Sequence, residues 1–360
     1  MTPRLPVLTP GQLGDVQEAV MQATAHTRAH LHQHFPVLRD WFASRSFPAG
    51  SFPDLRALAA RKRRRGLTVS LILPTLNVAD TLPQVLDEVA AVSRGDTLLV
   101  DQVIVVDGAS TDATMDIARR AGAEVYLQDA LLPDFGPALG KGDAMWRALA
   151  RADGDIIVFA DTDTRNFHRD FVTATIGPLI VEPEIRLSKA AFRRPFTGDS
   201  QDITADGGGR VTELTAKPLF NVFFPELAGF AQPLAGEFAG TRDLLYSVPF
   251  FTGYGVETGL LIDTLRLAGL SAMAQVDVGV RMNRHQSLAD LGRMSYAVLR
   301  TVLHRAASPD LCLDGCCEHD PVAGPVSVYS HAVMTEDGFR LTEYAEELVE
   351  RPPLAELRAA

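Results

Sequence analysis

The sequence predicts a doubly wound α/β fold built on a mainly parallel sheet. Between residues 66 and 160, short β-branched apolar runs alternate with stretches of helical spacing. The runs are continuously apolar, which is typical of strands buried on both faces. Because helices separate the strands, we expect right-handed crossovers that place helices on both faces of one sheet.

The apolar pattern gives the elements of this sheet in order. We expect strands at 69–73, 103–106, 124–127 and 156–160, separated by helices at about 81–93, 112–121 and 142–152. After about residue 165 the alternation weakens, and the pattern favours helices at 211–222, 256–268 and 287–304. The second half of the chain is therefore assigned less completely than the first.

Both ends of the chain lie outside this pattern. Residues 1–65 are expected to form a helical N-terminal extension, because apolar residues recur at helical spacing between 10 and 45. We interpret the basic run at 61–65 as the solvated end of a helix. Residues 306–360 are punctuated by proline and glycine, which predicts an irregular C-terminal tail.

The composition is that of a soluble globular protein. Of the 360 residues, 46% are hydrophobic and 22% are charged, which excludes a disordered or fibrous chain. No run approaches the ~20 apolar residues of a membrane span, and the N-terminus has no secretory pattern, so a cytoplasmic location is expected. The formal net charge of −11 argues against nucleic-acid binding, which needs a basic surface. Cys312, Cys316 and Cys317 have no second cluster to complete a zinc tetrad, and we interpret them as reduced thiols.

Polar residues follow three of the predicted strands at the point where each ends. They lie at 74–77, 107–108 and 161–163. In open parallel sheets, ligands bind beyond the carboxyl ends of the strands. We therefore expect these three segments to line one cleft.

Asp161 and Asp163 are the strongest candidates for chemistry. Two carboxylates at i and i+2, just beyond a strand end, can converge on a hard cation such as Mg²⁺ or Mn²⁺ that also holds a diphosphate. The alternative interpretation is helix capping by the second aspartate, which leaves the first unexplained.

Two glycine-rich segments suggest further contacts to anions. Residues 136–142 carry Lys141 but lack the spacing and the hydroxyl residue of a phosphate loop, which excludes a P-loop NTPase. Two interpretations of this segment remain: a loop that brings Lys141 to a nucleotide, or a simple turn before the next helix. Residues 207–212 supply backbone N–H groups, the guanidinium of Arg210 and the hydroxyl of Thr212, a set suited to a phosphate or carboxylate. The alternative is a flexible loop with a solvated arginine.

Seven segments carry a resemblance to a known family: in chain order they are residues 73–77, 106–112, 140–142, 161–163, 207–214, 232–237 and 253–257. Together they resemble the glucosyl-3-phosphoglycerate synthases and their mannosyl-3-phosphoglycerate synthase relatives. The resemblance covers roughly residues 45–305. It implies a retaining, metal-dependent glycosyltransferase of the GT-A fold that moves a hexose from a nucleotide diphosphate sugar to 3-phosphoglycerate. It also implies a nucleotide-sugar-binding half at 66–165, an acceptor-binding half at 166–305 and a homodimer.

The resemblance assigns roles to residues of this chain. The donor would be bound by Pro74, Thr75, Leu76, Gly108, Lys141, Asp161, Thr162 and Tyr254, and the acceptor by Gly209, Arg210, Thr212 and His285. The catalytic residues would be Asp163, Leu234 and Glu257. Mg²⁺ or Mn²⁺ would be held by Asp163, Asn283 and His285.

The chain departs from the glucosyl pattern at two positions. Val78 stands where those enzymes usually carry a ribose-contacting glutamate, and Asn283 stands where they carry a metal-binding histidine. These departures leave the donor base and sugar open, with mannosyl transfer from GDP-mannose as the alternative.

Two other classes of protein match less well. A sugar-1-phosphate nucleotidyltransferase shares the fold type, but its glycine-rich signature is missing from residues 74–77. A non-catalytic nucleotide-sugar binding module is disfavoured by the intact pair Asp161 and Asp163. No G-x-G-x-x-G follows the first strand, which argues against a nicotinamide-dependent enzyme.

Overall fold

The computed structural model describes residues 36–197, 203–204, 208–282, 286–306, 326–335 and 338–359. The chain divides into two compact units, Met1–Ser44 and Arg45–Ala360. In the first unit, the described residues 36–44 are helical, as the predicted extension requires. The second unit contains the sheet and all the described site residues.

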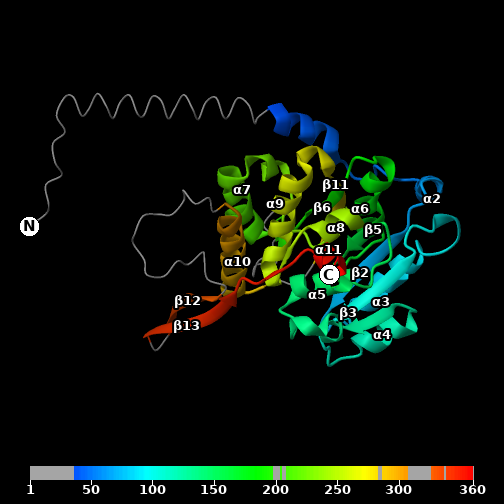
Figure 1. The fold of residues 1–360 in the computed structure, drawn as a ribbon. Coiled ribbons are helices and arrows are strands. Elements are labelled where there is room, and N and C mark those ends of the chain that lie inside the picture. The colour runs from blue at the N-terminus through cyan, green and yellow to red at the C-terminus, as the bar shows by residue number, and fades with distance from the viewer. Residues whose placement is uncertain are drawn as a thin grey trace, which may run out of the picture. The chain divides into compact units, whose positions relative to one another are not determined.

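An eight-stranded sheet forms the centre of the larger unit (Figure 1). In spatial order its strands are β1 (Ser46–Phe47), β11 (Met273–Val280), β6 (Leu187–Arg193), β9 (Phe238–Thr241), β5 (Ile156–Phe159), β2 (Val69–Thr75), β3 (Gln102–Asp107) and β4 (Glu124–Leu127). All neighbouring strands are parallel except β9, which runs antiparallel to both β5 and β6. The predicted doubly wound, mainly parallel sheet is confirmed.

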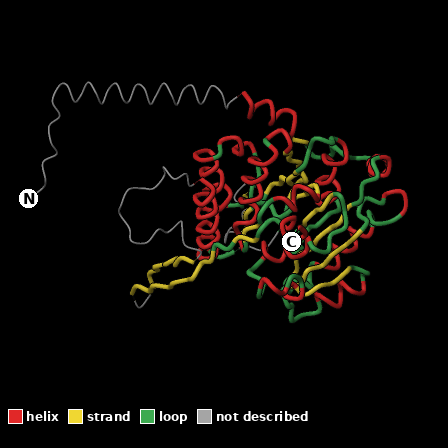
Figure 2. The backbone as a smooth tube through the Cα atoms, viewed as in Figure 1, coloured by secondary structure: helices red, strands yellow, loops and turns green. Residues whose placement is uncertain are grey.

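Helices flank this sheet, and further helices pack on those helices (Figure 2). They are α2 (Leu55–Arg64), α3 (Leu82–Ala90), α4 (Thr114–Arg120), α5 (Lys141–Leu149), α6 (Asp170–Val181), α7 (Lys217–Phe223), α8 (Arg242–Ser247), α9 (Val256–Ala268), α10 (Leu288–Ala306) and α11 (Leu354–Ala359). The helices predicted at 81–93, 112–121, 142–152 and 256–268 correspond to α3, α4, α5 and α9. Within the described part of the chain, none of them has the length and apolar composition needed to cross a membrane.

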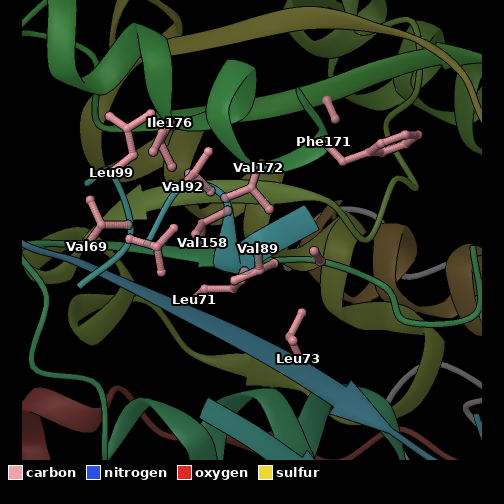
Figure 3. Close-up of a cluster of buried hydrophobic side chains, with 14 of the residues drawn as sticks. Val69, Leu71, Leu73, Val89, Val92, Leu99, Val158, Phe171, Val172 and Ile176 are labelled. Atoms are coloured by element: carbon pink, nitrogen blue, oxygen red, sulfur yellow. The ribbon is translucent and has the colours of Figure 1, made fainter. Parts of the chain in front are cut away.

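The hydrophobic core explains why the first strand is almost entirely apolar. Val69, Leu71 and Leu73 of β2 belong to one buried cluster with Val89 of α3 and Ile176 of α6 (Figure 3). The residues that alternate with them, Ser70 and Ile72, are also fully buried. Both faces of β2 are therefore covered, as expected for a parallel strand in the middle of a sheet.

Three strands of the second half do not follow from the sequence pattern. They are β6, β9 and β11. β6 contains a buried lysine, Lys189, and β11 contains a buried glutamine, Gln275. Polar residues inside these strands break the apolar run, and β9 has only four residues, so the local pattern is too weak to identify a strand.

The expectation of an irregular tail is wrong. Within the described residues, β12 (Val326–Thr335) and β13 (Gly338–Glu347) form an antiparallel hairpin, and β14 (Glu350–Arg351) pairs with β10 (Phe250–Phe251). Another short pair consists of β7 (Phe196–Thr197) and β8 (Ile203–Thr204). The three cysteines lie outside the described residues.

The basic run at 61–65 is only partly solvated, contrary to our interpretation. Lys62 is 2% exposed, and its Nζ lies 2.5 Å from the carboxylate of Asp101. Arg65 donates to the carbonyl oxygens of Leu179 (2.7 Å) and Ile180 (2.9 Å) at the end of α6. The run therefore anchors α2 within the larger unit, and the two units divide at residue 44 rather than at residue 65.

Candidate active site

A cavity of about 520 Å³ lies beyond the carboxyl ends of β2 and β5. Between these two strands the chain order reverses, because β3 and β4 extend the sheet on one side and β5 begins the other. Such switch points are where doubly wound sheets bind ligands. The cavity is lined by every predicted site residue that the structure describes: Pro74, Thr75, Leu76, Gly108, Lys141, Asp161, Thr162, Asp163, Gly209, Arg210, Thr212, Leu234, Tyr254 and Glu257. Asn283 and His285 lie outside the described residues.

Side-chain hydrogen bonds join the turns that follow β2 and β3. Asp107 is fully buried and accepts from the hydroxyl of Thr75 (2.8 Å) and from the N–H and hydroxyl of Ser110 (2.6 and 2.7 Å). Asn77 has a φ of 52°, and its Oδ1 accepts from the N–H of Thr111 (2.9 Å). These bonds fix the wall of the cavity where the nucleoside is predicted to lie.

Thr162 holds the turn after β5 in place through two hydrogen bonds. Its side chain is buried, and its hydroxyl donates to the carbonyl oxygen of Pro74 (2.8 Å). Its own carbonyl oxygen accepts from the hydroxyl of Thr81 (2.6 Å). The turn that carries Asp161 and Asp163 is thereby tied to the end of β2.

Asp161 is paired with two cations. The Nζ of Lys141 lies 2.5 Å from one carboxylate oxygen, and the Nη2 of Arg281 lies 2.9 Å from the other. Burial raises the pKa of this carboxyl, but the charges of Lys141 and Arg281 together outweigh burial and hold the pKa of Asp161 well below its ordinary value. Asp161 is therefore ionised at neutral pH.

Arg281 is the centre of this charged network and is absent from the predicted site residues. It is 5% exposed and donates to the hydroxyl of Thr164 (3.1 Å) and to the carboxylates of Glu237 (3.1 Å), Asp161 (2.9 Å) and Asp163 (3.0 Å). Burial lowers the pKa of the guanidinium, but the three carboxylates outweigh burial and raise the pKa above its ordinary value. Arg281 follows β11 as the aspartates follow β5, so it could have been found only if the pattern had predicted β11.

Lys141, the first residue of α5, connects Asp161 to the start of α9. Its Nζ also lies 3.2 Å from Oε1 of Glu257. Burial lowers the pKa of this amine, but Asp161 and Glu257 raise it above its ordinary value. A Cβ at Gly236 would lie 2.4 Å from Lys141 Nζ and from both oxygens of Asp161. The turn that carries Leu234 therefore packs its backbone directly against the ion pair, which only glycine permits at position 236.

Glu237 and Lys189 are buried titratable groups that the sequence analysis does not assign to the site. One carboxylate oxygen of Glu237 accepts from Arg281, and the other has no hydrogen-bond partner among the described residues. Burial raises the pKa of Glu237 to about 7, with the charge of Arg281 opposing the shift and that of Asp161 adding to it. Lys189 donates to the carbonyl oxygen of Ala235, and burial lowers the pKa of Lys189 to about 8.

The glycine loop, residues 208–212, lines the same cavity. The N–H of Gly208 donates to the carbonyl oxygen of Arg194 (3.0 Å), and a Cβ on Gly208 would lie 2.6 Å from that oxygen. Gly209 has a φ of 73°, in the left-handed region that favours glycine. The loop leads into a π-helix, Thr212–Ala216, a form that is frequent at functional sites. Arg194, which the sequence analysis does not single out, also lines the cavity and adds a second guanidinium to this part of it.

The described residues fit a cation that is shared with a substrate. Among them, no group of three or more His, Cys, Asp or Glu side chains is arranged to hold a metal ion. Asp163 lines the cavity with its side chain 53% exposed, and its Oδ1 accepts from Arg281. Mg²⁺ is often held by one or two carboxylates together with substrate phosphates. Asp163 is the most exposed of the three carboxylates that line the cavity, and its position suits that arrangement.

The fold and the site together define a class of protein. A cavity at the switch point of a doubly wound sheet is lined by an acidic pair and by a separate glycine-rich loop that carries Arg210. Residues 70–180 match the family model described as Glycosyl transferase family 2. The class is that of the glycosyltransferases with the GT-A fold.

The relatives narrow this class. Glucosyl-3-phosphoglycerate synthase of Mycolicibacterium paratuberculosis is 46% identical over 274 residues, which cover 75% of this chain and 81% of the relative. The crystal structure of mannosyl-3-phosphoglycerate synthase from Rubrobacter xylanophilus matches with a TM-score of 0.80 at 50% identity, covering 89% of this chain and 98% of that one. Glucosyl-3-phosphoglycerate synthase from Mycobacterium tuberculosis, in complex with Mn²⁺, UDP and glucosyl-3-phosphoglycerate, matches with a TM-score of 0.71 at 40% identity, covering 85% and 96%. The chain belongs to the glucosyl-3-phosphoglycerate synthase family.

Proposed function

We propose that this protein transfers glucose from a nucleotide diphosphate sugar to 3-phosphoglycerate and releases a nucleoside diphosphate. One observation carries the proposal. A single cavity joins a charged pair suited to a diphosphate, Asp161 and Lys141, with a loop suited to a small phosphorylated acid, which contains Arg210 and Thr212. The Mycobacterium tuberculosis relative binds Mn²⁺, UDP and glucosyl-3-phosphoglycerate, the ligands that such a cavity would hold together.

The donor end of the cavity would stabilise the leaving group through the ammonium group of Lys141 together with a bound divalent cation. Lys141 is held between Asp161 and Glu257, so its ammonium group is fixed before substrate arrives. A preorganised charge stabilises a developing anion without further reorganisation. Mg²⁺ or Mn²⁺, when bound, supplies the same stabilisation to the diphosphate as a Lewis acid, and Asp163 is the described residue that would hold it.

The acceptor end supplies the charges that match 3-phosphoglycerate. The acceptor has a phosphate and a carboxylate, and Arg210 and Arg194 bring two guanidinium groups to the part of the cavity formed by the glycine loop. Guanidinium groups bind both kinds of anion through paired hydrogen bonds. The backbone of Gly209 and the hydroxyl of Thr212 complete this proposed acceptor site.

The reaction needs both substrates in one orientation. The 2-hydroxyl oxygen of the acceptor forms a bond to the anomeric carbon, the bond from that carbon to the diphosphate breaks, and the hydroxyl proton is released. We assign Leu234, Tyr254 and Glu257, which line the same cavity, to the sugar. Holding two reactants in place replaces an encounter in solution and can contribute about 7–11 kcal/mol to catalysis.

Mannosyl transfer from a guanosine-linked donor is the second candidate. Val78 is 8% exposed and lines the cavity where the glucosyl enzymes usually carry a glutamate. A site without that carboxylate lacks one hydrogen-bond acceptor for the ribose and discriminates less between nucleosides. The 50% identity with the mannosyl enzyme of Rubrobacter xylanophilus favours the same candidate.

The test compares donors side by side. Release of nucleoside diphosphate is measured with UDP-glucose, GDP-glucose and GDP-mannose, with and without 3-phosphoglycerate, and the product is identified by mass spectrometry. We expect release only with acceptor present, and a Val78→Glu variant should shift kcat/KM toward the uridine donor. Release that ignores 3-phosphoglycerate, or nucleotide formation from a sugar 1-phosphate, would contradict the proposal.

We also propose that the protein is cytoplasmic and forms a homodimer. Among the described residues, β12 and β13 pair only with each other, and Val328 and Leu341 on them are exposed. One part of the hairpin packs on α10, where the ring centroids of Tyr329 and Tyr296 lie 5.4 Å apart. Val328 and Leu341 remain exposed, and a second copy of the chain is a suitable partner for them. Size-exclusion chromatography with light scattering should give twice the mass of one chain. A variant with Val328 and Leu341 replaced by serine should elute as a monomer.

A further inference from the structure

We propose that Arg351, near the C-terminus, is a positioning residue for the donor site. It acts together with the backbone of Val349 and Pro352, and we call these three residues the C-terminal clamp. The inference rests on the proposed function, because it assigns Lys141 to the donor diphosphate. The clamp holds the two segments from which Lys141 and Tyr254 reach the cavity.

The first contact is a two-pronged ion pair with the start of α5. Arg351 is 8% exposed, and its Nε and Nη2 donate to the two carboxylate oxygens of Asp143, at 2.9 and 2.6 Å. Asp143 is fully buried and lies two residues after Lys141 in the first turn of the helix. The same carboxylate accepts from the N–H of Leu139 (2.9 Å). Arg351 therefore fixes the turn from which Lys141 projects.

The second contact extends this network around the glycine-rich segment. Arg147 donates to Asp143 (3.1 Å) and to the carbonyl oxygens of Leu131 (2.7 Å) and Gly136 (2.6 Å). The indole N–H of Trp146 donates to the carbonyl oxygen of Pro352 (2.8 Å). The loop at 131–140 is thus held by buried side chains of α5, and α5 is held by the clamp.

The third contact joins the clamp to the other wall of the donor site. The carbonyl oxygen of Val349 accepts from the N–H (2.9 Å) and the hydroxyl (3.1 Å) of Thr252. Thr252 follows β10, which pairs with β14, and it leads into the turn that carries Tyr254. A Cβ on Gly142 would lie 2.1 Å from the carbonyl oxygen of Phe251, so the two walls are in backbone contact.

The effect on the donor follows from this geometry. Lys141 can stabilise the diphosphate only if its ammonium group lies next to it. A displacement of a catalytic group by about 1 Å can lower the rate on the order of a hundredfold. Removing Arg351 leaves Asp143 buried with one arginine fewer and releases the first turn of α5. The acceptor loop at 208–212 makes none of these contacts, so donor binding and acceptor binding should respond differently.

The experiment uses the full chain and three arginine variants. Arg351→Met removes the charge and keeps the length of the side chain, Arg351→Lys keeps the charge without the two-pronged geometry, and Arg242→Met is the matched control. Arg242 pairs with Asp155 (2.9 Å), just before β5 and therefore at the opposite end of that strand from Asp161. For each variant we measure the donor KM, the acceptor KM, the melting temperature, and the affinity for UDP and GDP by calorimetry with Mn²⁺.

We expect Arg351→Met to raise the donor KM and weaken nucleoside diphosphate affinity by about tenfold or more, with the acceptor KM changed less than about twofold. Arg351→Lys should fall between this variant and the wild type, and Arg242→Met should lower the melting temperature without moving either KM. If Arg351→Met does not fold, Arg351→Lys carries the test.

Equal changes in both KM values, or a folded Arg351 variant with unchanged nucleoside diphosphate affinity, would overturn the role of the clamp. The calorimetric measurement of UDP and GDP affinity tests the clamp independently of the proposed function, because it does not require sugar transfer. A wild-type protein that binds nucleoside diphosphate but transfers no sugar contradicts the function and still tests the clamp.

Discussion

Asp143 and Glu237 are both fully buried carboxylates with arginine partners, yet their protonation behaviour is opposite. Asp143 accepts from both Arg147 and Arg351. Burial raises its pKa, but these hydrogen bonds outweigh burial and hold the pKa of Asp143 below its ordinary value. Among the described residues, the carboxylate of Glu237 accepts a hydrogen bond only from Arg281, and burial raises the pKa of Glu237 to about 7.

The difference separates two charge clusters. Asp143 with Arg147 and Arg351 does not line the cavity and acts on it only by holding α5, and we call it the structural cluster. The groups paired with Lys141 and Arg281 at the cavity form the functional cluster. At Asp143 the chain itself supplies every partner that the carboxylate needs. In the ion-pair network beside the cavity, Lys141 and Arg281 are shared by four carboxylates, those of Asp161, Asp163, Glu237 and Glu257. Carboxylates therefore outnumber the cations that pair with them directly, which suits a site that takes up a cation with its substrate.

The largest expected effect is on stability at the structural cluster. Asp143→Asn leaves two buried guanidinium groups without their carboxylate, which should lower the free energy of unfolding by about 3–5 kcal/mol. Urea denaturation measures this loss. Asp116→Asn, which breaks the exposed pair with Arg119, should cost less than about 1 kcal/mol. Comparable losses in the two variants would remove the distinction.

The functional cluster should behave in the reverse way. Asp163→Asn removes a half-exposed carboxylate, so the melting temperature should change little. Sugar transfer should fall by about 10²–10³-fold, because charge stabilisation in the transition state is lost. Steady-state rates across a range of Mn²⁺ concentrations check this, and full activity at low Mn²⁺ would show that Asp163 holds no cation.

The acceptor loop offers a more selective change. Arg210→Met removes a charged hydrogen-bond donor from the cavity, and the acceptor KM should rise by about 10–100-fold, while the donor KM stays close to that of the wild type. Initial rates with each substrate varied in turn measure both values. Lys217→Met, in the same helical segment and paired with Glu213, is the control and should leave both values unchanged. A parallel rise in both KM values would instead indicate a structural role for Arg210.

The smallest effect is a pH dependence with opposite signs at the two carboxylates. Because the pKa of Glu237 is raised to about 7, the folded state binds more protons than the unfolded state between about pH 4.5 and 7. The contribution of Glu237 to stability therefore falls as pH rises through this window, and Glu237→Gln should gain on the wild type across it. The pKa of Asp143 is lowered, so its contribution is present at neutral pH and is lost as pH falls below about 3.8. Denaturation curves for Glu237→Gln and Asp143→Asn at pH 3, 5 and 7.5 measure these slopes, and equal slopes would refute the assignment.

The first half of the fold and the segments of the candidate site can be predicted from the amino-acid sequence alone. Strands such as β2 and β5 are buried on both faces, so nearly every residue is apolar and the pattern is visible locally. The positions of Asp161, Lys141 and Arg210 follow from the same local signals, because each stands at the end of a strand or the start of a helix. All of them line the cavity.

Which charged side chains pair with one another depends on the three-dimensional packing of the chain. Arg281 lies 120 residues from Asp161, and Arg351 lies 208 residues from Asp143. Periodicity records whether a residue is buried, but a buried polar residue such as Lys189 interrupts the pattern, and its partner cannot be found nearby in the chain. Such residues are tolerated only where the fold brings the compensating group to them, and that group is fixed by strand order and packing rather than by local sequence.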